Sequence, residues 1–239
     1  MVNNIEYLGL NVFEGKLYNK KTYIFWNKTI DTMPVYIQKM LKPFDYGQRE
    51  NGFHHSISAF ISDCSIEKLN CLIDFVIKEY DIKIDKKIFL QDFIAIADLD
   101  KNTHYDPIIS FKYNNGKICG VSFYITALKD KSLVFSYLET VKKQLNLSCI
   151  PELSQLITDC VTKRYADMFQ VSWDFECRYI KQNKIYLKIK NIFELVKECN
   201  SMFPYMKEFI EIEDFRFCEI AFVVSENKLN MLNLYFKPL

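Results

Sequence analysis

The sequence predicts an α+β fold in which one antiparallel sheet, either closed into a barrel or left open on one side, carries helices on its outer face. Three observations lead to this prediction: pairs of extended runs joined by a turn recur four times, helical segments separate the pairs, and the extended runs have one apolar and one polar face. The repetition indicates one architecture built from similar units. The chain of 239 residues is therefore expected to form a single domain, residues 1–239.

The four pairs are expected to be β-hairpins at residues 4–25, 107–127, 169–190 and 217–237, each turning at a Gly-Lys or Asn-Lys pair. In the return strand of the third hairpin, Ile185 and Leu187 alternate with Tyr186 and Lys188. Side chains of successive strand residues point to opposite faces, so each hairpin offers one apolar face for helices and one polar face rich in tyrosine and lysine.

Segments of helical period lie between the hairpins. Helices are expected at residues 65–80, 132–145, 151–164 and 192–210, the last broken at Pro204, with a weaker one at 35–41. One additional strand is expected at residues 91–98, where FIAIAD is an extended apolar run, giving nine strands in total.

The polar strand faces allow two interpretations. An antiparallel sheet with helices on one face can leave its other face in water, or the sheet can close so that the polar faces line a chamber. Tyr23, Tyr124, Tyr186 and Tyr235 recur beside lysines, whereas a solvated face is usually Lys, Glu, Thr and Ser. The tyrosines favour the chamber.

Composition excludes several classes of protein. The net charge of +1 gives no global field for nucleic acid or an anionic membrane. The 8 cysteines are scattered without metal-ligand spacing and are interpreted as reduced thiols. The sequence shows neither a signal-peptide pattern nor an apolar run long enough to span a membrane, so a cytoplasmic protein is expected.

Other motifs give no site. The run from Asp98 starts like a calcium loop, but Thr103 replaces the glycine and Ile109 the glutamate. His54 and His55 are expected in a loop. No Asp-Asp-x-x-Asp cluster for magnesium and no Gly-rich phosphate loop occur in the sequence.

With these hairpins the chain resembles the ABBA-type prenyltransferases, and within them the peptide prenyltransferases of the cyanobactin type. The resemblance lies in the first hairpin, with Glu6 early on its outgoing strand and Lys21 five residues past Lys16, in the aromatic and acidic alternation of the third hairpin, and in the closing strand LNMLNLYFKPL. The family's fold is one barrel of repeated α-β-β-α units with helices outside. The family has five hairpins, whereas four and a single strand are predicted here.

The resemblance implies the roles of the candidate residues. Glu6 is the expected general base, with Glu219 and Asp174 as rivals that, together with Trp173, lie on the acceptor side. The expected diphosphate ligands are Lys21, Lys112, Arg178, Lys188, Lys190 and Lys237. The aromatic residues expected to shield an allylic cation are Tyr23, Tyr124, Tyr186 and Tyr235.

The implied activity is transfer of a dimethylallyl or longer group from its diphosphate to a peptide side chain or terminus, in a linear or macrocyclic peptide, with a small aromatic acceptor as the other option. The prenyl diphosphate is a co-substrate, no cofactor is essential, and magnesium is an assisting ion. The alternative hypotheses are a non-catalytic α+β protein that binds a peptide or lipid, and a structural protein.

Overall fold

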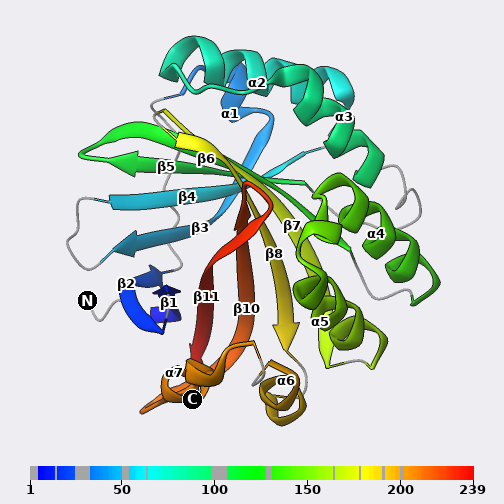
Figure 1. The fold of residues 1–239 in the computed structure, drawn as a ribbon. Coiled ribbons are helices and arrows are strands. Elements are labelled where there is room, and N and C mark those ends of the chain that lie inside the picture. The colour runs from blue at the N-terminus through cyan, green and yellow to red at the C-terminus, as the bar shows by residue number, and fades with distance from the viewer. Residues whose placement is uncertain are drawn as a thin grey trace.

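In the computed structural model, an antiparallel sheet curves around a common interior and carries helices on its outer side (Figure 1). The structure describes residues 5–13, 15–24, 33–49, 54–62, 64–97, 107–127, 131–163, 165–177, 179–189, 192–199 and 202–239. For some of these residues, Glu6, Lys21 and Tyr23 among them, it describes the backbone alone.

The elements follow the expected alternation of hairpins and helices. The strands are β1 (Ile5–Phe13), β2 (Lys16–Ile24), β3 (Leu41–Arg49), β4 (His54–Ile61), β5 (Ile108–Asn114), β6 (Lys117–Ala127), β7 (Ala166–Glu176), β8 (Tyr179–Ile189), β9 (Glu211–Ile212), β10 (Phe215–Ser225) and β11 (Lys228–Pro238). The helices are α1 (Val35–Gln38), α2 (Ile66–Tyr80), α3 (Lys86–Ala97), α4 (Lys131–Gln144), α5 (Pro151–Thr162), α6 (Ile192–Cys199) and α7 (Lys207–Ile210).

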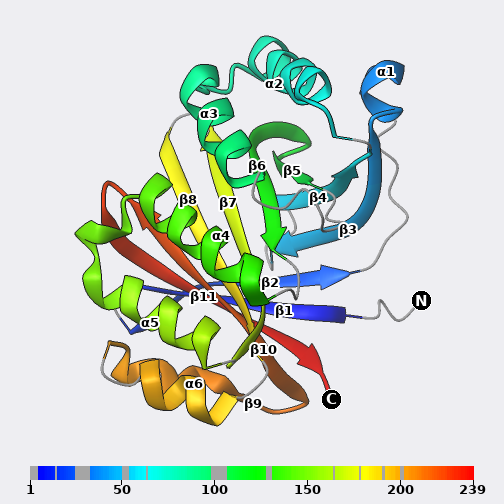
Figure 2. The same cartoon turned by 90° about the vertical axis from the view of Figure 1, so that its right-hand side faces the viewer.

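Strand pairing runs in the order β11-β1-β2-β3-β4-β5-β6-β7-β8-β10, and β10 also pairs with β11. Each of these ten described strands therefore has two antiparallel neighbours, while β9 adds a short pairing to β10. The ladder returns to its first strand, which is the pairing of a closed barrel. The expected antiparallel barrel with outer helices is confirmed, and Figure 2 shows α2 to α6 lying along one side of it.

The described strands form five hairpins, where the sequence predicted four and a single strand. The unpredicted hairpin joins β3 to β4, so the expected loop position of His54 and His55 is wrong: both lie in β4. Pro43 concealed β3, because proline cannot donate a ladder hydrogen bond. The ladder accommodates it with a register shift between Pro43 and Asp45.

The third hairpin turns earlier than predicted. Strand β7 ends at Glu176 and β8 begins at Tyr179, so the connection is at residues 177–178. Asn183 and Lys184, the expected turn, lie in the middle of β8, where they pair with Trp173 and Ser172. The error matters because it moves Lys184 from a loop into the barrel wall.

The strand expected at residues 91–98 is a helix, α3 (Lys86–Ala97). The buried residues Phe89, Phe93 and Ile96 recur at helical spacing and begin upstream of the predicted strand. The Asp85 carboxylate accepts a hydrogen bond from the backbone N–H of Ile88 at 3.1 Å, which satisfies a first-turn donor. Lys86 and Lys87 concealed this helix start.

The other predicted helices are confirmed with shifted ends. Ser65 caps α2 by accepting a hydrogen bond from the Lys68 N–H at 3.2 Å, and Pro151 begins α5. The helix expected at residues 192–210 is interrupted, with α6 ending at Cys199 and a 3₁₀ turn at Pro204–Met206 preceding α7. Among the described residues, no helix is long and apolar enough to cross a membrane.

The hydrophobic core lies between the outer face of the sheet and the helices. Phe89 of α3 is its centre on this side, with ring centroids 4.9 Å from Phe123, 5.7 Å from Trp173 and 5.4 Å from Phe175. Its side chain is 1% exposed. Trp173 and Phe175 show that the odd-numbered side chains of β7 pack against the helices. Its even-numbered side chains therefore point toward the barrel interior.

We expect Phe89→Ala to lower the free energy of unfolding by about 3–5 kcal/mol, because it leaves a cavity among four aromatic rings. Ile88→Ala is the matched control on the same helix turn, since Ile88 is 51% exposed; its cost should stay below about 0.5 kcal/mol. Urea unfolding of both variants measures the difference. Equal costs would show that α3 does not pack on the barrel as described.

Candidate functional site

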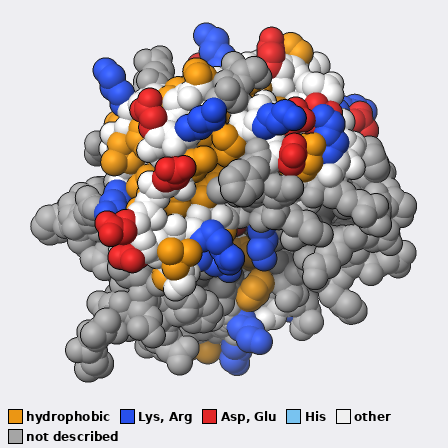
Figure 3. Space-filling view, turned by 90° about the horizontal axis from the view of Figure 1, so that it is seen from below, with side chains coloured by type: hydrophobic (Ala, Val, Ile, Leu, Met, Phe, Trp, Pro, Cys, Tyr) orange, Lys and Arg blue, Asp and Glu red, His pale blue; other side chains and the backbone are white. Residues whose placement is uncertain are grey.

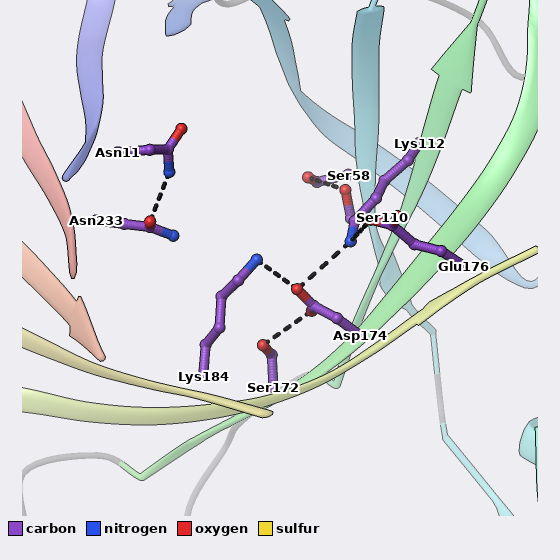
Figure 4. A network of polar contacts seen from close by, with 9 residues as sticks. All are labelled: Asn11, Ser58, Ser110, Lys112, Ser172, Asp174, Glu176, Lys184 and Asn233. Atoms are coloured by element: carbon purple, nitrogen blue, oxygen red, sulfur yellow. Dashed lines mark hydrogen bonds and ion pairs between the residues drawn. The ribbon is translucent and has the colours of Figure 1, made fainter. Parts of the chain in front are cut away.

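Polar side chains from strands far apart in the sequence meet on the inner side of the barrel (Figure 4). Asn11 of β1 donates a hydrogen bond to Asn233 of β11 at 2.5 Å, and Ser58 of β4 donates one to Ser110 of β5 at 3.2 Å. The interior is thus lined with amides and hydroxyls in addition to the expected lysines and tyrosines. Asn11, Ser58 and Ser110 were not among the sequence candidates, because small polar residues on a strand face carry no distinct signal.

Asp174 is the centre of a buried ion cluster, which we call the Asp174 cluster (Lys112, Asp174, Glu176 and Lys184). Lys112 Nζ lies 3.4 Å from Asp174 Oδ2, and Lys184 Nζ contacts the same oxygen. Ser172 Oγ donates a hydrogen bond to Asp174 Oδ1 at 3.1 Å. Asp174 is 3% exposed, so its charge depends on these partners.

The electrostatics of the Asp174 cluster are balanced. Burial alone would raise the pKa of Asp174, but Lys112 and Lys184 hold it well below its usual range. Lys112 also lies 3.3 Å from Glu176 Oε1, across Gly120, which separates their backbones in the ladder. A side chain at Gly120 would collide there, because its Cβ would lie 2.8 Å from the Phe175 carbonyl oxygen. The two lysines of the cluster, Lys112 and Lys184, are therefore matched by its two carboxylates.

Three of the four tyrosine candidates form a line across the interior, the tyrosine line (Tyr124, Tyr186 and Tyr235). The ring centroids of Tyr124 and Tyr186 are 5.9 Å apart, and those of Tyr186 and Tyr235 are 6.1 Å apart. Burial raises the pKa of Tyr124 to about 12 and raises that of Tyr235 as well. Tyr124 and Tyr235 therefore stay neutral at physiological pH.

A second charged group, the mouth cluster (Lys188, Arg216, Glu219 and Lys237), lies at the other end of the tyrosine line. Glu219 pairs in the ladder with Lys188 on one side and with Tyr235 on the other. Arg216 is directly opposite Lys237. Figure 3 views the molecule from below, where β8 and β11 end, and shows Lys and Arg side chains gathered near the centre of this face.

Among its described residues, the mouth cluster carries more positive than negative charge. It has three cations and one carboxylate. Two of the cations, Arg216 and Lys237, lie directly opposite each other in the ladder, where like charges destabilise a sheet. Burial raises the pKa of Glu219 to about 7, against the opposing effects of Lys188 and Lys237. Lys188 is exposed, so the cluster is open to solvent. An anion entering this end of the barrel would relieve the repulsion between Arg216 and Lys237.

The residues that the sequence analysis proposed for the site lie in different parts of the structure. Lys188, Glu219, Lys237 and Tyr235 come together at the mouth, while Lys112 and Asp174 neutralise each other inside. Trp173, expected on the acceptor side, lies instead on the helix-facing side of β7, where its ring is 5.6 Å from Phe93. Arg178, Lys190 and the side chains of Glu6, Lys21 and Tyr23 lie outside the described residues.

Three charged residues of these clusters, Glu176, Lys184 and Arg216, were not among the sequence candidates. Lys184 was assigned to a turn, and Arg216 lies one residue before the predicted start of the fourth hairpin. A correct position for the third turn would have placed Lys184 on the same face as Tyr186 and Lys188.

The backbone of Lys21 belongs to the same row of the ladder as the mouth cluster. Lys21 pairs with Gly9, which pairs with Tyr235. The row therefore reads Lys188, Glu219, Tyr235, Gly9 and Lys21 across β8, β10, β11, β1 and β2. Gly9 contributes no side chain to it.

Solved structures with the same fold are prenyltransferases. The crystal structure of NotF prenyltransferase aligns with a TM-score of 0.57 and 9% identity over 98% of this chain and 80% of that chain, as does that of NotF in complex with brevianamide F and DMSPP. The 6-dimethylallyltryptophan synthase from Micromonospora olivasterospora, in complex with DMASPP and Trp, aligns with a TM-score of 0.53 and 8% identity over 97% and 81% of the two chains. No protein-family model and no curated protein sequence matches the chain. The likeness establishes the ABBA barrel fold.

Proposed function

We propose that this protein is a prenyltransferase, which moves a prenyl group from its diphosphate to an acceptor inside the barrel. The observation that carries the proposal is that three described cations, Lys188, Arg216 and Lys237, gather at the end of the tyrosine line. A prenyl diphosphate has the matching form, an anionic head joined to an apolar chain. The fold shared with NotF and the 6-dimethylallyltryptophan synthase supports this assignment.

The difference between the two charged clusters supports the mouth cluster as the diphosphate site. The Asp174 cluster already has two anions for its two cations, so Lys112 and Lys184 offer no net attraction. Among its described residues, the mouth cluster has three cations and one carboxylate. Lys188, Arg216 and Lys237 would therefore hold the diphosphate oxygens and stabilise the charge that grows as the C–O bond breaks.

The tyrosine line would shelter the allylic cation formed in this reaction. Tyr235 adjoins Glu219 in the ladder, and Tyr186 and Tyr124 continue the line away from the mouth. Aromatic ring faces attract a cation and exclude water that would quench it. The prenyl chain would thus extend along the tyrosine line toward the Asp174 cluster.

Glu6 and Lys21 keep the roles that the family resemblance implies. Glu6 would accept the proton that the acceptor loses, and Lys21 would join the diphosphate ligands from its place in the mouth row. Magnesium is proposed only as an assisting ion at the diphosphate.

The acceptor is proposed to be a small aromatic molecule, because the two neighbouring structures are complexes with brevianamide F and with Trp. A peptide acceptor of the cyanobactin type, linear or macrocyclic, is the second candidate. An open barrel would have favoured a bulky acceptor, but the described strands close the ladder and remove that reason.

The first test incubates the protein with dimethylallyl diphosphate and tryptophan, a linear peptide or a macrocyclic peptide, and detects product by mass spectrometry. We expect a mass increase of one prenyl group on at least one acceptor. Lys21→Ala should abolish turnover without unfolding the protein, since lysine rarely belongs to a hydrophobic core.

Calorimetric titration with inorganic diphosphate separates a wrong acceptor from a wrong function. Diphosphate binding without turnover would leave the donor site intact and send the search to other acceptors. Absence of diphosphate binding, with a native circular dichroism spectrum, would refute the prenyltransferase proposal and favour a non-catalytic protein that binds a peptide or lipid.

A further inference from the structure

Glu219 is an acidic side chain at the position where the diphosphate is proposed to bind. It lies between Lys188 of β8 and Tyr235 of β11 in the ladder, and Lys237 of β11 also acts on its charge. A carboxylate here would repel the incoming diphosphate and compete with it for the same lysines. Either the Glu219 carboxylate weakens binding of the prenyl diphosphate, or it takes up a proton when the prenyl diphosphate binds.

The surroundings of Glu219 favour proton binding. Among the described groups, Lys188 and Lys237 stabilise the ionised carboxyl against the cost of burial, and burial already raises its pKa to about 7. Diphosphate would neutralise both lysines and add negative charge of its own. With its stabilisation removed, the carboxyl would be protonated well above neutral pH.

The other described groups near Glu219 do not oppose this change. Tyr235 is neutral because burial raises its pKa, and β1 contributes Gly9 at the next position of the row. Cys218, next along β10, donates a hydrogen bond from its thiol to the Tyr235 carbonyl oxygen at 3.3 Å, and burial raises its pKa to about 12. Arg216, farther along β10, faces Lys237 and belongs to the diphosphate ligands.

We propose that Glu219 takes up a proton when diphosphate binds the mouth cluster and gives this proton to the leaving diphosphate. The inference rests on the proposed prenyl transfer. It adds a proton donor to a reaction for which the sequence analysis considered only a base.

The step balances in atoms and charge. The bond between the prenyl carbon and the diphosphate oxygen breaks, and its electron pair stays on that oxygen, which receives the Glu219 proton. The carboxylate left behind is stabilised by Lys188 and Lys237 as the diphosphate departs. The acceptor forms the new bond to the prenyl carbon and loses its proton to Glu6, and both carboxyl groups then exchange protons with water.

The test measures protons taken up when inorganic diphosphate binds at pH 8, by calorimetry in two buffers of different ionisation enthalpy. In the free protein, a carboxyl with a pKa of about 7 is mostly ionised at this pH. We expect the wild type to take up at least about half a proton more than Glu219→Gln. Protonation of the diphosphate itself contributes equally to both proteins.

Glu176→Gln is the matched control, because Glu176 is a second acidic residue of the barrel but belongs to the Asp174 cluster. Its proton uptake should equal that of the wild type. Should Glu219→Gln fail to fold, infrared difference spectra of the wild type report the same event, as a protonated-carboxyl band that appears when diphosphate is added.

The possible results separate this inference from the proposed function. Diphosphate binding with equal proton uptake in the wild type and Glu219→Gln, or without a new carboxyl band in the wild type, would overturn the role of Glu219 and leave prenyl transfer standing. No diphosphate binding by the wild type would refute both.

Discussion

Asp174→Asn is expected to lower the free energy of unfolding by about 3 kcal/mol, the largest effect that we predict for any single interior polar residue. The substitution preserves the shape of the side chain and removes its charge. Lys112 and Lys184, whose side chains are 23% and 16% exposed, would then face each other in the barrel without the carboxylate that both contact. The loss is placed at the lower end of the usual range because both lysines retain some hydration.

Glu176→Gln is the control for this prediction too. Glu176 also pairs with Lys112, but its side chain is 41% exposed, so its loss should cost less than about 1 kcal/mol. Guanidinium unfolding of both variants measures the two costs. Costs of equal size would contradict the central position of Asp174 in the cluster.

The pH dependence of stability gives a second measurement on Asp174. Its pKa is lowered in the folded protein, so the folded state binds the proton less tightly than the unfolded chain does. The stabilisation is therefore complete above the unfolded pKa of about 4 and is lost as pH falls below it. The wild type and Asp174→Asn should differ in stability at pH 7 and converge as the pH approaches 2.

The sequence predicted which side chains share a face of a strand better than it predicted which strands pair with each other. Period-two alternation placed Tyr124, Tyr186 and Tyr235 on one face each, and the barrel brings all three together. Alternation follows from the covalent geometry of an extended chain, so it is visible locally. Lys112 of β5 comes within reach of Asp174 of β7 because β6 pairs with β7, and this pairing between two different hairpins has no local signal.

Where the secondary structure predicted from local sequence was wrong, strand pairing or packing between distant residues determined the structure instead. Pro43 argues against a strand, but a register shift accommodates it in β3. The apolar run within residues 91–98 suggested a strand, but Phe89, Phe93 and Ile96 pack on the barrel as one face of a helix. The Asn183–Lys184 pair resembled a turn, but the ladder continues through both residues, which is why Lys184 was missed.

The double substitution Lys188→Gln and Lys237→Gln is expected to weaken diphosphate binding by at least about 100-fold, because each hydrogen bond between a charged donor and an anion contributes about 1.5–3 kcal/mol. Lys188 and Lys237 belong to the mouth cluster, in which Arg216 alone would remain as a described cation. Calorimetric titration with inorganic diphosphate measures the change.

Stability should change little in this variant, and the reason is specific to the mouth cluster. Both lysines lower the pKa of Glu219, so their removal raises it further and leaves the carboxyl neutral at pH 7 instead of buried as an unpaired charge. The matched control replaces Lys117 and Lys228, which begin β6 and β11 at exposed turns, with glutamine. It removes the same net charge, so an equal loss of diphosphate affinity in the control would mean that overall charge attracts the anion and that the mouth cluster is not its site.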